Sequence, residues 1–201
     1  MSSLVYLETN WIVGAVMGQD TRAGELLSLP ESEVQLALPA VCVMEAISAF
    51  NRKRDGRNKF KAELARQLGD LQRSIDVSSA QQLVTELTDA DLTNDKLLSE
   101  LFQRLDATLS GIANRAQLIP ISAGIIQEQT QLSRQTELDR ADALILSSIL
   151  AHSKSESIDR KAFLTGNFRD FEKEPVKLLL AEAGIKQFKS TGKLLGWIET
   201  G

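Results

Sequence analysis

The alternation of short apolar runs with longer helical stretches constrains the fold of this chain most strongly. Strand-like apolar runs recur along the 201 residues at 4–8, 34–38, 117–121, 162–165 and 185–189. Apolar residues at helical spacing fill the intervals between these runs. Parallel strands need long crossover connections, usually helices, to return to the same end of a sheet. The alternation therefore predicts an α/β fold with a mostly parallel central sheet and helices on both faces.

The long interval between the second and third strands predicts an all-helical insertion. We expect a helical elaboration at about 55–112 within a single domain of residues 1–201, because no repeat or linker divides the chain. Leucines from Leu83 to Leu109 share one helix face, which core packing and a homodimer contact explain equally well. The expected helices lie near 10–17, 21–28, 40–54, 58–74, 79–112 with a break at TDADLTND, 122–134, 140–152, 174–183 and 190–199.

Composition excludes several classes of protein. Cys42 is the only cysteine, so the chain has neither an intrachain disulfide nor a thiolate metal cage. The first residues lack the features of a secretory signal, and no segment approaches the roughly 20 apolar residues of a membrane span. We therefore expect a cytoplasmic protein without membrane contact. The net charge of −4 means that any contact with a polyanion must be local.

One local basic run is a candidate for such a contact. The sequence NRKRDGRNKFK, residues 51–61, carries six lysines and arginines, among them Arg52, Lys53 and Arg54. A run of this kind is either a solvated helix end or a surface that holds phosphate groups.

Carboxylates and amides recur where the predicted strands end. In an open parallel sheet, the carboxyl ends of the strands share one crevice, and ligands bind there. Glu8 closes the first run, and the helix that follows the second run carries Glu45. Another helix begins at Asp139 and carries Asp142, and the fourth run leads into FLTGNFRDF, residues 163–171.

These acids do not all call for the same explanation. Asp139 precedes a helix and is predicted to be its N-cap. Asp142 lies in the first turn, where the helix dipole favours a carboxylate by about 0.3–1 kcal/mol, so a structural role would suffice. Glu45 is flanked by apolar residues and needs a partner, either an arginine or a metal ion. Gathering Glu8, Glu45 and Asp142 would cost about 4 kcal/mol per close pair at an effective dielectric of 20, a cost that a divalent ion removes.

Four motifs, in this order, resemble those of the PIN-domain nucleases, especially the VapC-type ribonuclease toxins of bacterial toxin–antitoxin pairs. VYLETN resembles the family's opening strand, and LPAVCVMEAISAF resembles the motif that carries its second acid, here Glu45. LDRADALILSSIL is similar to the motif that carries the third acid, here Asp142. FLTGNFRDF resembles a closing motif that reads Thr-x-Asn-x-x-Asp-Phe, matched by Thr165, Asn167 and Asp170.

The resemblance implies a three-layer α/β/α sandwich and hydrolysis of RNA phosphodiester bonds that depends on Mg²⁺ or Mn²⁺. By the same resemblance, Glu8, Glu45 and Asp142 hold the ion and Asp170 is a further catalytic acid. An antitoxin protein is the implied partner, besides RNA. The residues expected to bind substrate are Asn10, Thr165, Asn167, Arg52, Lys53 and Arg54.

Two departures from the family pattern keep a second interpretation open. Glu8 stands where the family normally has aspartate, and its extra methylene displaces a ligand for which Mg²⁺ demands near-ideal geometry. Asn167 stands where many relatives have a fourth acid. The alternative is therefore a catalytically weak or inactive PIN-like scaffold that binds RNA or a partner protein. A dyad of Cys42 and His152 is a further alternative, which nothing in the spacing favours.

Overall fold

The computed structural model describes residues 2–74 and 76–200. The chain divides into two compact units. Residues Met1–Ala46 and Ala107–Gly201 form the first, here called the α/β unit, and Ile47–Asp106 form the second, here called the helical unit. The prediction that the chain is one domain stays a prediction.

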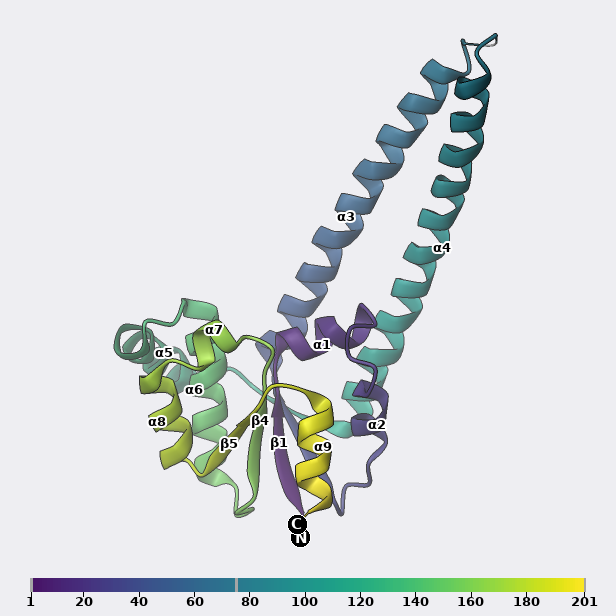
Figure 1. Ribbon diagram of the computed structural model, residues 1–201. Helices are drawn as coiled ribbons and strands as arrows, with labels where there is room; N and C mark the ends of the chain where they lie inside the picture. The colour runs from purple at the N-terminus through teal and green to yellow at the C-terminus, as the bar shows by residue number, and fades with distance from the viewer. Residues whose placement is uncertain (1, 75, 201) are drawn as a thin grey trace. The chain divides into compact units, whose positions relative to one another are not determined.

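A five-stranded, entirely parallel sheet forms the centre of the α/β unit (Figure 1). The strand order is β3-β2-β1-β4-β5. The strands are β1 (Ser3–Leu7), β2 (Val34–Pro39), β3 (Ala116–Ile119), β4 (Lys161–Leu164) and β5 (Ile185–Phe188). All five predicted strands are therefore confirmed, to within two residues at each end.

The central strand β1 reads as a continuous apolar run because both of its faces are covered. Every residue from Ser3 to Leu7 is buried, as expected for an inner strand of a parallel sheet. The backbone pairs Val5 with Leu36 on β2 and with Ala162 on β4. Burial of such runs from several strands supplies the main hydrophobic stabilisation of the unit.

Helices cover both faces of this sheet, which gives the predicted three-layer α/β/α arrangement (Figure 1). On one face, α6 packs against α5 and the sheet, and α8 lies beside α5. On the other face, α2 contacts both α1 and α9. The helices outside the helical unit are α1 (Thr9–Val16), α2 (Ala23–Ser28), α5 (Ala123–Thr136), α6 (Arg140–Ser155), α7 (Phe168–Phe171), α8 (Glu174–Glu182) and α9 (Thr191–Glu199).

Two long helices correct the sequence-based boundaries. We predicted separate helices at 40–54 and 58–74, and a break at TDADLTND, but α3 (Ala40–Leu71) and α4 (Ser78–Arg115) are each continuous. Gly56 costs α3 about 1 kcal/mol relative to alanine, and the strong helix formers around it, mainly lysines and arginines, offset that cost. Residues 88–95 of α4 stay helical, and the Thr88 hydroxyl donates to the Val84 carbonyl one turn back.

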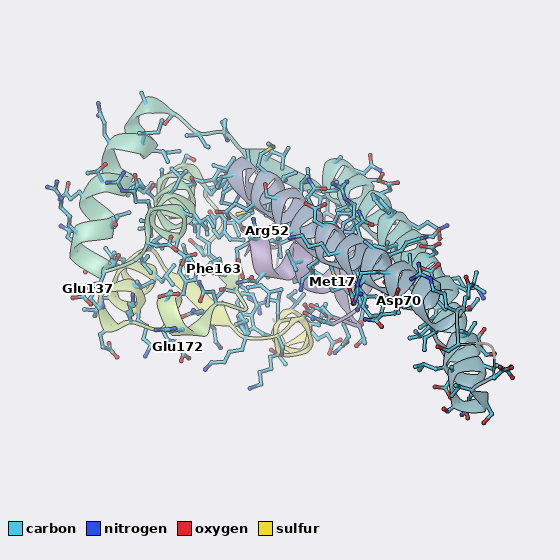
Figure 2. All side chains as sticks on the ribbon, turned by 90° about the horizontal axis from the view of Figure 1, so that it is seen from above. Met17, Arg52, Asp70, Glu137, Phe163 and Glu172 are labelled. Carbon is cyan, nitrogen blue, oxygen red and sulfur yellow. The ribbon has the colours of Figure 1, made fainter. Side chains whose placement is uncertain are left out.

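The helical unit consists of the α3 and α4 segments between Ile47 and Asp106, which run antiparallel. Phe50 meets Phe102 edge to face, with ring centroids 5.0 Å apart, and the Lys61 ammonium lies 2.5 Å from the Asp95 carboxylate. Leu64 and Leu105 are buried, whereas Leu83, from the predicted leucine stripe, is 41% exposed. Charged side chains extend outward along both helices, and Arg52 and Asp70 are labelled in Figure 2. Homodimerisation through the stripe stays a prediction.

Within the described residues, no helix combines the length and the apolar composition that a membrane crossing requires.

Candidate active site

The candidate site lies where the strand order of the α/β unit reverses. From β1 the chain builds outward through β2 and β3, and then returns to place β4 on the opposite side of β1. In open α/β sheets this switch point forms a crevice at the carboxyl ends of the strands. Glu8 follows β1 and Thr165 follows β4, so these two residues face each other across the crevice.

Glu8 is buried, and its donors in the described part of the chain are all neutral. One carboxylate oxygen accepts the Asn10 backbone N–H at 2.8 Å, which makes Glu8 the N-cap of α1. The other accepts the Thr165 hydroxyl at 3.2 Å and the Gly166 backbone N–H at 3.0 Å. Burial raises the pKa of Glu8, while these hydrogen bonds oppose the rise. A carboxylate has about four lone-pair sites, so Glu8 retains about one for a further ligand.

Glu45 projects from the second turn of α3 and is half-buried. Its Oε2 atom accepts the Thr9 hydroxyl at 2.6 Å. In residues 2–74 and 76–200, no lysine or arginine lies within ion-pair distance of Glu8, Glu45 or Asp142. The arginine salt bridge weighed for Glu45 is therefore absent from the described part of the chain.

The surroundings of Asp142 strongly favour its protonated form. Its Oδ2 atom accepts the Asn167 side-chain N–H at 2.9 Å. Partial burial is the largest cause that raises the pKa of Asp142, to about 7. Neighbouring negative charges add to this effect, in decreasing order Asp139, Asp170, Glu8 and Glu45. Acids from its own helix and from three other segments thus lie close enough to Asp142 to oppose its ionisation.

Asp139 and Asp170 differ from these three acids. Asp139 is confirmed as the N-cap of α6, because one of its oxygens accepts the backbone N–H groups of Ala141 and Asp142, each at 2.8 Å. Asp170 lies in the short helix α7 and pairs with the Lys173 ammonium at 3.3 Å. The negative charge of Asp170 acts on Asp142, but the Lys173 ammonium already neutralises part of that charge.

The predicted substrate-binding residues fall into two groups. Asn10, Thr165 and Asn167 belong to the α/β unit and contact the carboxylates through the hydrogen bonds described above. The residues Arg52, Lys53 and Arg54 belong to the helical unit. Their contact with phosphate stays a prediction.

Cys42 and His152 do not form a catalytic pair. His152 Nδ1 hydrogen-bonds the Tyr6 hydroxyl at 3.1 Å, and its Nε2 atom lies 3.3 Å from Glu156. Cys42 is buried, and burial raises the pKa of its thiol to about 12. A thiol with so high a pKa is a poor nucleophile at neutral pH.

Sequence reasoning missed two contributors to the site. Thr9 positions Glu45, although its place directly after the first acid could have indicated a role. Gly166 contributes only its backbone N–H, and a Cβ atom at this position would lie 3.3 Å from the Asn10 Cβ atom. A glycine that allows such an approach leaves no distinctive signal in a single sequence.

Two carboxylates of the candidate site have an oxygen available to a divalent cation. Among the described residues, no three acid, histidine or cysteine side chains converge closely enough to form a complete metal cage. Glu45 and Asp142 each use one oxygen for a neutral donor, and the other accepts no hydrogen bond from the described part of the chain. Mg²⁺ is commonly bound through one or two carboxylates, with waters and substrate phosphate completing its shell.

A comparison with models of known protein families agrees with this architecture. A family model described as PIN domain matches residues 5–171. No curated protein was found that matches the chain. Among solved structures, the chain is similar to the crystal structure of VapBC2 from Rickettsia felis bound to a DNA fragment from their promoter. The identity is 14%, the match covers 92% of this chain and 98% of that one, and the TM-score is 0.45.

Proposed function

The chain belongs to the PIN-domain family, and from that premise we propose that it is a metal-dependent ribonuclease that hydrolyses RNA phosphodiester bonds at the Glu8, Glu45 and Asp142 carboxylates. The observation that carries this proposal is electrostatic. Three buried or half-buried acids share one crevice with no lysine or arginine to balance them among the described residues. Such a cluster is costly to fold unless a cation binds it.

Mg²⁺ or Mn²⁺ would supply charge neutralisation of the phosphate and activation of water for in-line attack. Glu45 and Asp142 would be the direct ligands, because each presents an oxygen that the protein does not use. Glu8 would add negative charge behind them and use its remaining lone pair for the ion or for one of its waters. Its three neutral donors hold the longer side chain in place. Asp170 would contribute negative charge near the ion without binding it, and its ion pair with Lys173 would reduce that charge.

Neutral residues would orient this machinery. Thr9 fixes the rotamer of Glu45 through its hydroxyl, and Asn167 does the same for Asp142 through its amide. Asn10 is exposed at the crevice, where its side chain would contact the substrate, and Thr165 fixes Glu8. Because ligand geometry must hold to well under an ångström, these four residues are expected to affect the rate of cleavage without binding the ion themselves.

The decisive test compares two aspartates on the same helix. Asp142→Asn should abolish Mn²⁺-dependent cleavage of single-stranded RNA and remove the rise in melting temperature that Mn²⁺ produces. Asp139→Asn is the matched control, since asparagine also serves as an N-cap, and it should keep cleavage. Retained cleavage by Asp142→Asn would remove Asp142 from the mechanism. A wild type that neither cleaves nor gains stability from Mn²⁺ would favour the scaffold alternative.

Arg52, Lys53 and Arg54 would bind the phosphate backbone. Replacing all three by glutamine should weaken RNA binding and flatten its salt dependence, by up to about 0.7 in the log–log slope for each lost phosphate contact with single strands. Arg66→Gln is the control, because Arg66 is already paired with Glu63 and Asp70. An unchanged slope would make the basic run a solvated surface. Association with an antitoxin stays a prediction of the sequence resemblance.

A further inference from the structure

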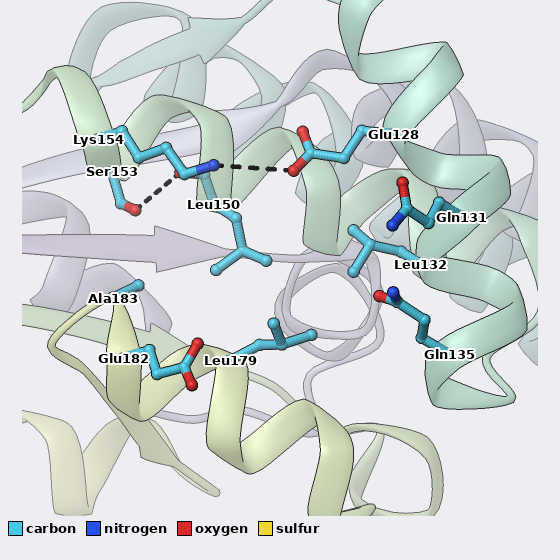
Figure 3. Close-up of a pocket in the computed structure, with 10 residues that line it drawn as sticks. All are labelled: Glu128, Gln131, Leu132, Gln135, Leu150, Ser153, Lys154, Leu179, Glu182 and Ala183. Carbon is cyan, nitrogen blue, oxygen red and sulfur yellow. Dashed lines mark hydrogen bonds and ion pairs between the residues drawn. The ribbon is translucent and has the colours of Figure 1, made fainter.

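Two pockets in the described part of the α/β unit are similar in size but differ in chemistry. One, of about 450 Å³, lies between α5, α6 and α8, with Leu132, Leu150 and Leu179 on its walls (Figure 3). It includes none of the candidate-site residues. The other, of about 420 Å³, shares Asn10, Thr165 and Gly166 with the carboxylate crevice. Its volume lies within the roughly 300–1,000 Å³ that small-molecule sites occupy.

We propose that this second pocket, here called the flanking pocket, binds one unstacked nucleotide of a single-stranded RNA, next to the phosphodiester bond that the carboxylates cleave. The inference rests on the proposed function and extends it to the form of the substrate. The first observation that supports it is that the pocket is continuous with the carboxylate crevice. Thr165 and Gly166 donate to Glu8 and also line the pocket, so a chain that crosses the crevice passes its mouth.

The pocket is hollow because three of its walls lack side chains. Gly14 from α1, Gly166 after β4 and Gly192 from α9 all line it. A Cβ atom added at Gly192 would lie 3.5 Å from the Arg22 guanidinium, and one at Gly14 would lie 3.8 Å from the Asp20 Cβ atom. Bare backbone at such positions allows a ligand to approach closely.

A hydrogen-bonded wall keeps the pocket open. The buried Trp11 indole N–H donates to the Thr191 hydroxyl at 3.2 Å, and this hydroxyl donates in turn to the Asp20 carboxylate. These two hydrogen bonds link α1 and the α1–α2 connection to α9, which lies near the other end of the sequence. A rigid, pre-formed wall reduces the entropic cost of binding a ligand.

The groups around the pocket match the parts of a nucleotide. Gln19, Thr21 and Ser190 offer neutral donors and acceptors for base edges and sugar hydroxyls. Arg22 and Lys189 are exposed cations at the same pocket, and each pairs with a surface acid, Glu25 and Glu172 respectively. Exposed pairs of this kind are worth little, so a phosphate can take the place of the acid.

The concave shape selects for single strands. A base inside a duplex is stacked and paired, so it cannot enter a pocket beside the scissile phosphate. Unstacked bases of single strands, loops and bulges can turn out of the chain and be read on their edges. The wide and shallow minor groove of an RNA duplex presents no group that would fill this pocket.

Two pairs of glycine variants test the inference. Gly192→Gln and Gly14→Gln place a side chain in the flanking pocket. Gly196→Gln on α9 and Gly24→Gln on α2 are matched controls, because nothing lies within 4 Å of a Cβ atom at either position. The probe is a fluorescently labelled single-stranded RNA of mixed sequence, titrated in EDTA so that metal-dependent hydrolysis does not consume it. Melting curves verify that each variant is folded, and either pocket variant suffices.

The pocket variants should raise the dissociation constant about tenfold or more, as expected for the loss of one bound nucleotide, and the controls by less than about twofold. The same RNA as a duplex should bind wild type more weakly. Equal binding by pocket variants and controls, equal binding of duplex and single strand, or no binding by wild type would overturn the inference. Cleavage by wild type in Mn²⁺ is measured separately, so loss of the pocket proposal and loss of the nuclease proposal give different results.

Discussion

The acids of the helical unit and those of the candidate active site have opposite surroundings. In the helical unit, Lys61 lies 2.5 Å from Asp95, and Arg66 lies within 3.3 Å of both Glu63 and Asp70. All of these side chains are at least 43% exposed. In the α/β unit, Glu8 is 1% exposed, and all the donors to its carboxylate among the described residues are neutral.

This contrast separates acids that keep a helix soluble from acids that indicate a site. Exposed ion pairs contribute about 0–1 kcal/mol each and need no further explanation. Buried acids with raised pKa values and no cation are destabilising on their own, and a fold usually retains such groups at functional sites.

Cleavage should give the largest difference between the two regions. Glu45→Gln removes a proposed ligand charge and should lower the rate of Mn²⁺-dependent RNA cleavage by at least about 100-fold, since a metal contributes several kcal/mol of transition-state stabilisation. Asp95→Asn in the helical unit should leave the rate unchanged. The two rates are measured on the same RNA in Mn²⁺. Similar rates for the two variants would mean that Glu45 matters no more for cleavage than an exposed acid of the helical unit.

The affinity for Mn²⁺ should depend steeply on pH. Because the pKa of Asp142 is raised to about 7, a proton must leave this group before an ion can bind below that pH. The association constant should therefore fall about tenfold for each pH unit below 7. Calorimetric titrations from pH 5 to 8 measure this slope. A flat profile would contradict the site, and Asp139→Asn should move the midpoint to lower pH.

The same raised pKa predicts how stability depends on pH without metal. Between about pH 4 and 7 the folded protein holds a proton on Asp142 that the unfolded chain has already lost. Stability from this group is therefore present at the acidic end and falls as the pH rises toward 7, and the raised pKa of Glu8 acts in the same direction. Urea unfolding in EDTA should show this fall in wild type and a weaker one in Asp142→Asn. An unchanged pH dependence would mean that Asp142 titrates normally.

A buried amide gives the helical unit its own test. Asn94 is 3% exposed, and neither polar atom of its side chain has a hydrogen-bond partner in the described residues. Asn94→Leu should therefore raise the free energy of unfolding by about 1–3 kcal/mol, the usual cost of an unsatisfied buried polar group. Asn94→Ala is the comparison variant and should gain less, because it leaves a void. Destabilisation by leucine would mean that the amide has a partner in solution.

The smallest effect should come from an exposed ion pair. Lys61→Met removes the partner of Asp95 and should change the free energy of unfolding by less than about 1 kcal/mol, with a smaller effect in high salt. Denaturant titrations at low and high ionic strength measure both quantities. If the free energy of unfolding fell by several kcal/mol, the Lys61–Asp95 pair would be structurally essential. The acids of the helical unit would then not be mere surface charges.

Local patterns predicted much of the fold, and long-range contacts limited the rest. The inner strand β1 could be predicted because it is buried on both faces and apolar from Leu4 to Leu7, whereas the edge strands β3 and β5 show shorter apolar runs with exposed positions. The breaks placed near Gly56 and at residues 88–95 were wrong, because continuous helices tolerate one glycine and several polar residues when their neighbours favour helix.

The site was only partly accessible from the sequence. Glu8 and Asp142 could be named from their places after a strand and at a helix start. The hydrogen bond from the Thr9 hydroxyl to Glu45 joins residues 36 positions apart, and the one from the Asn167 amide to Asp142 joins residues 25 positions apart. No local sequence pattern specifies contacts of this range. Whether Glu45 pairs with an arginine depends on such long-range contacts as well, so the alternatives stayed open until the fold was known.

The most direct test of the account is anomalous diffraction from a crystal soaked in Mn²⁺. We expect one strong peak in the crevice between β1 and β4, within bonding distance of oxygens from Glu45 and Asp142. A well-ordered crystal with no peak there, or with peaks only at acids such as Asp70 and Glu63 in the helical unit, would contradict it.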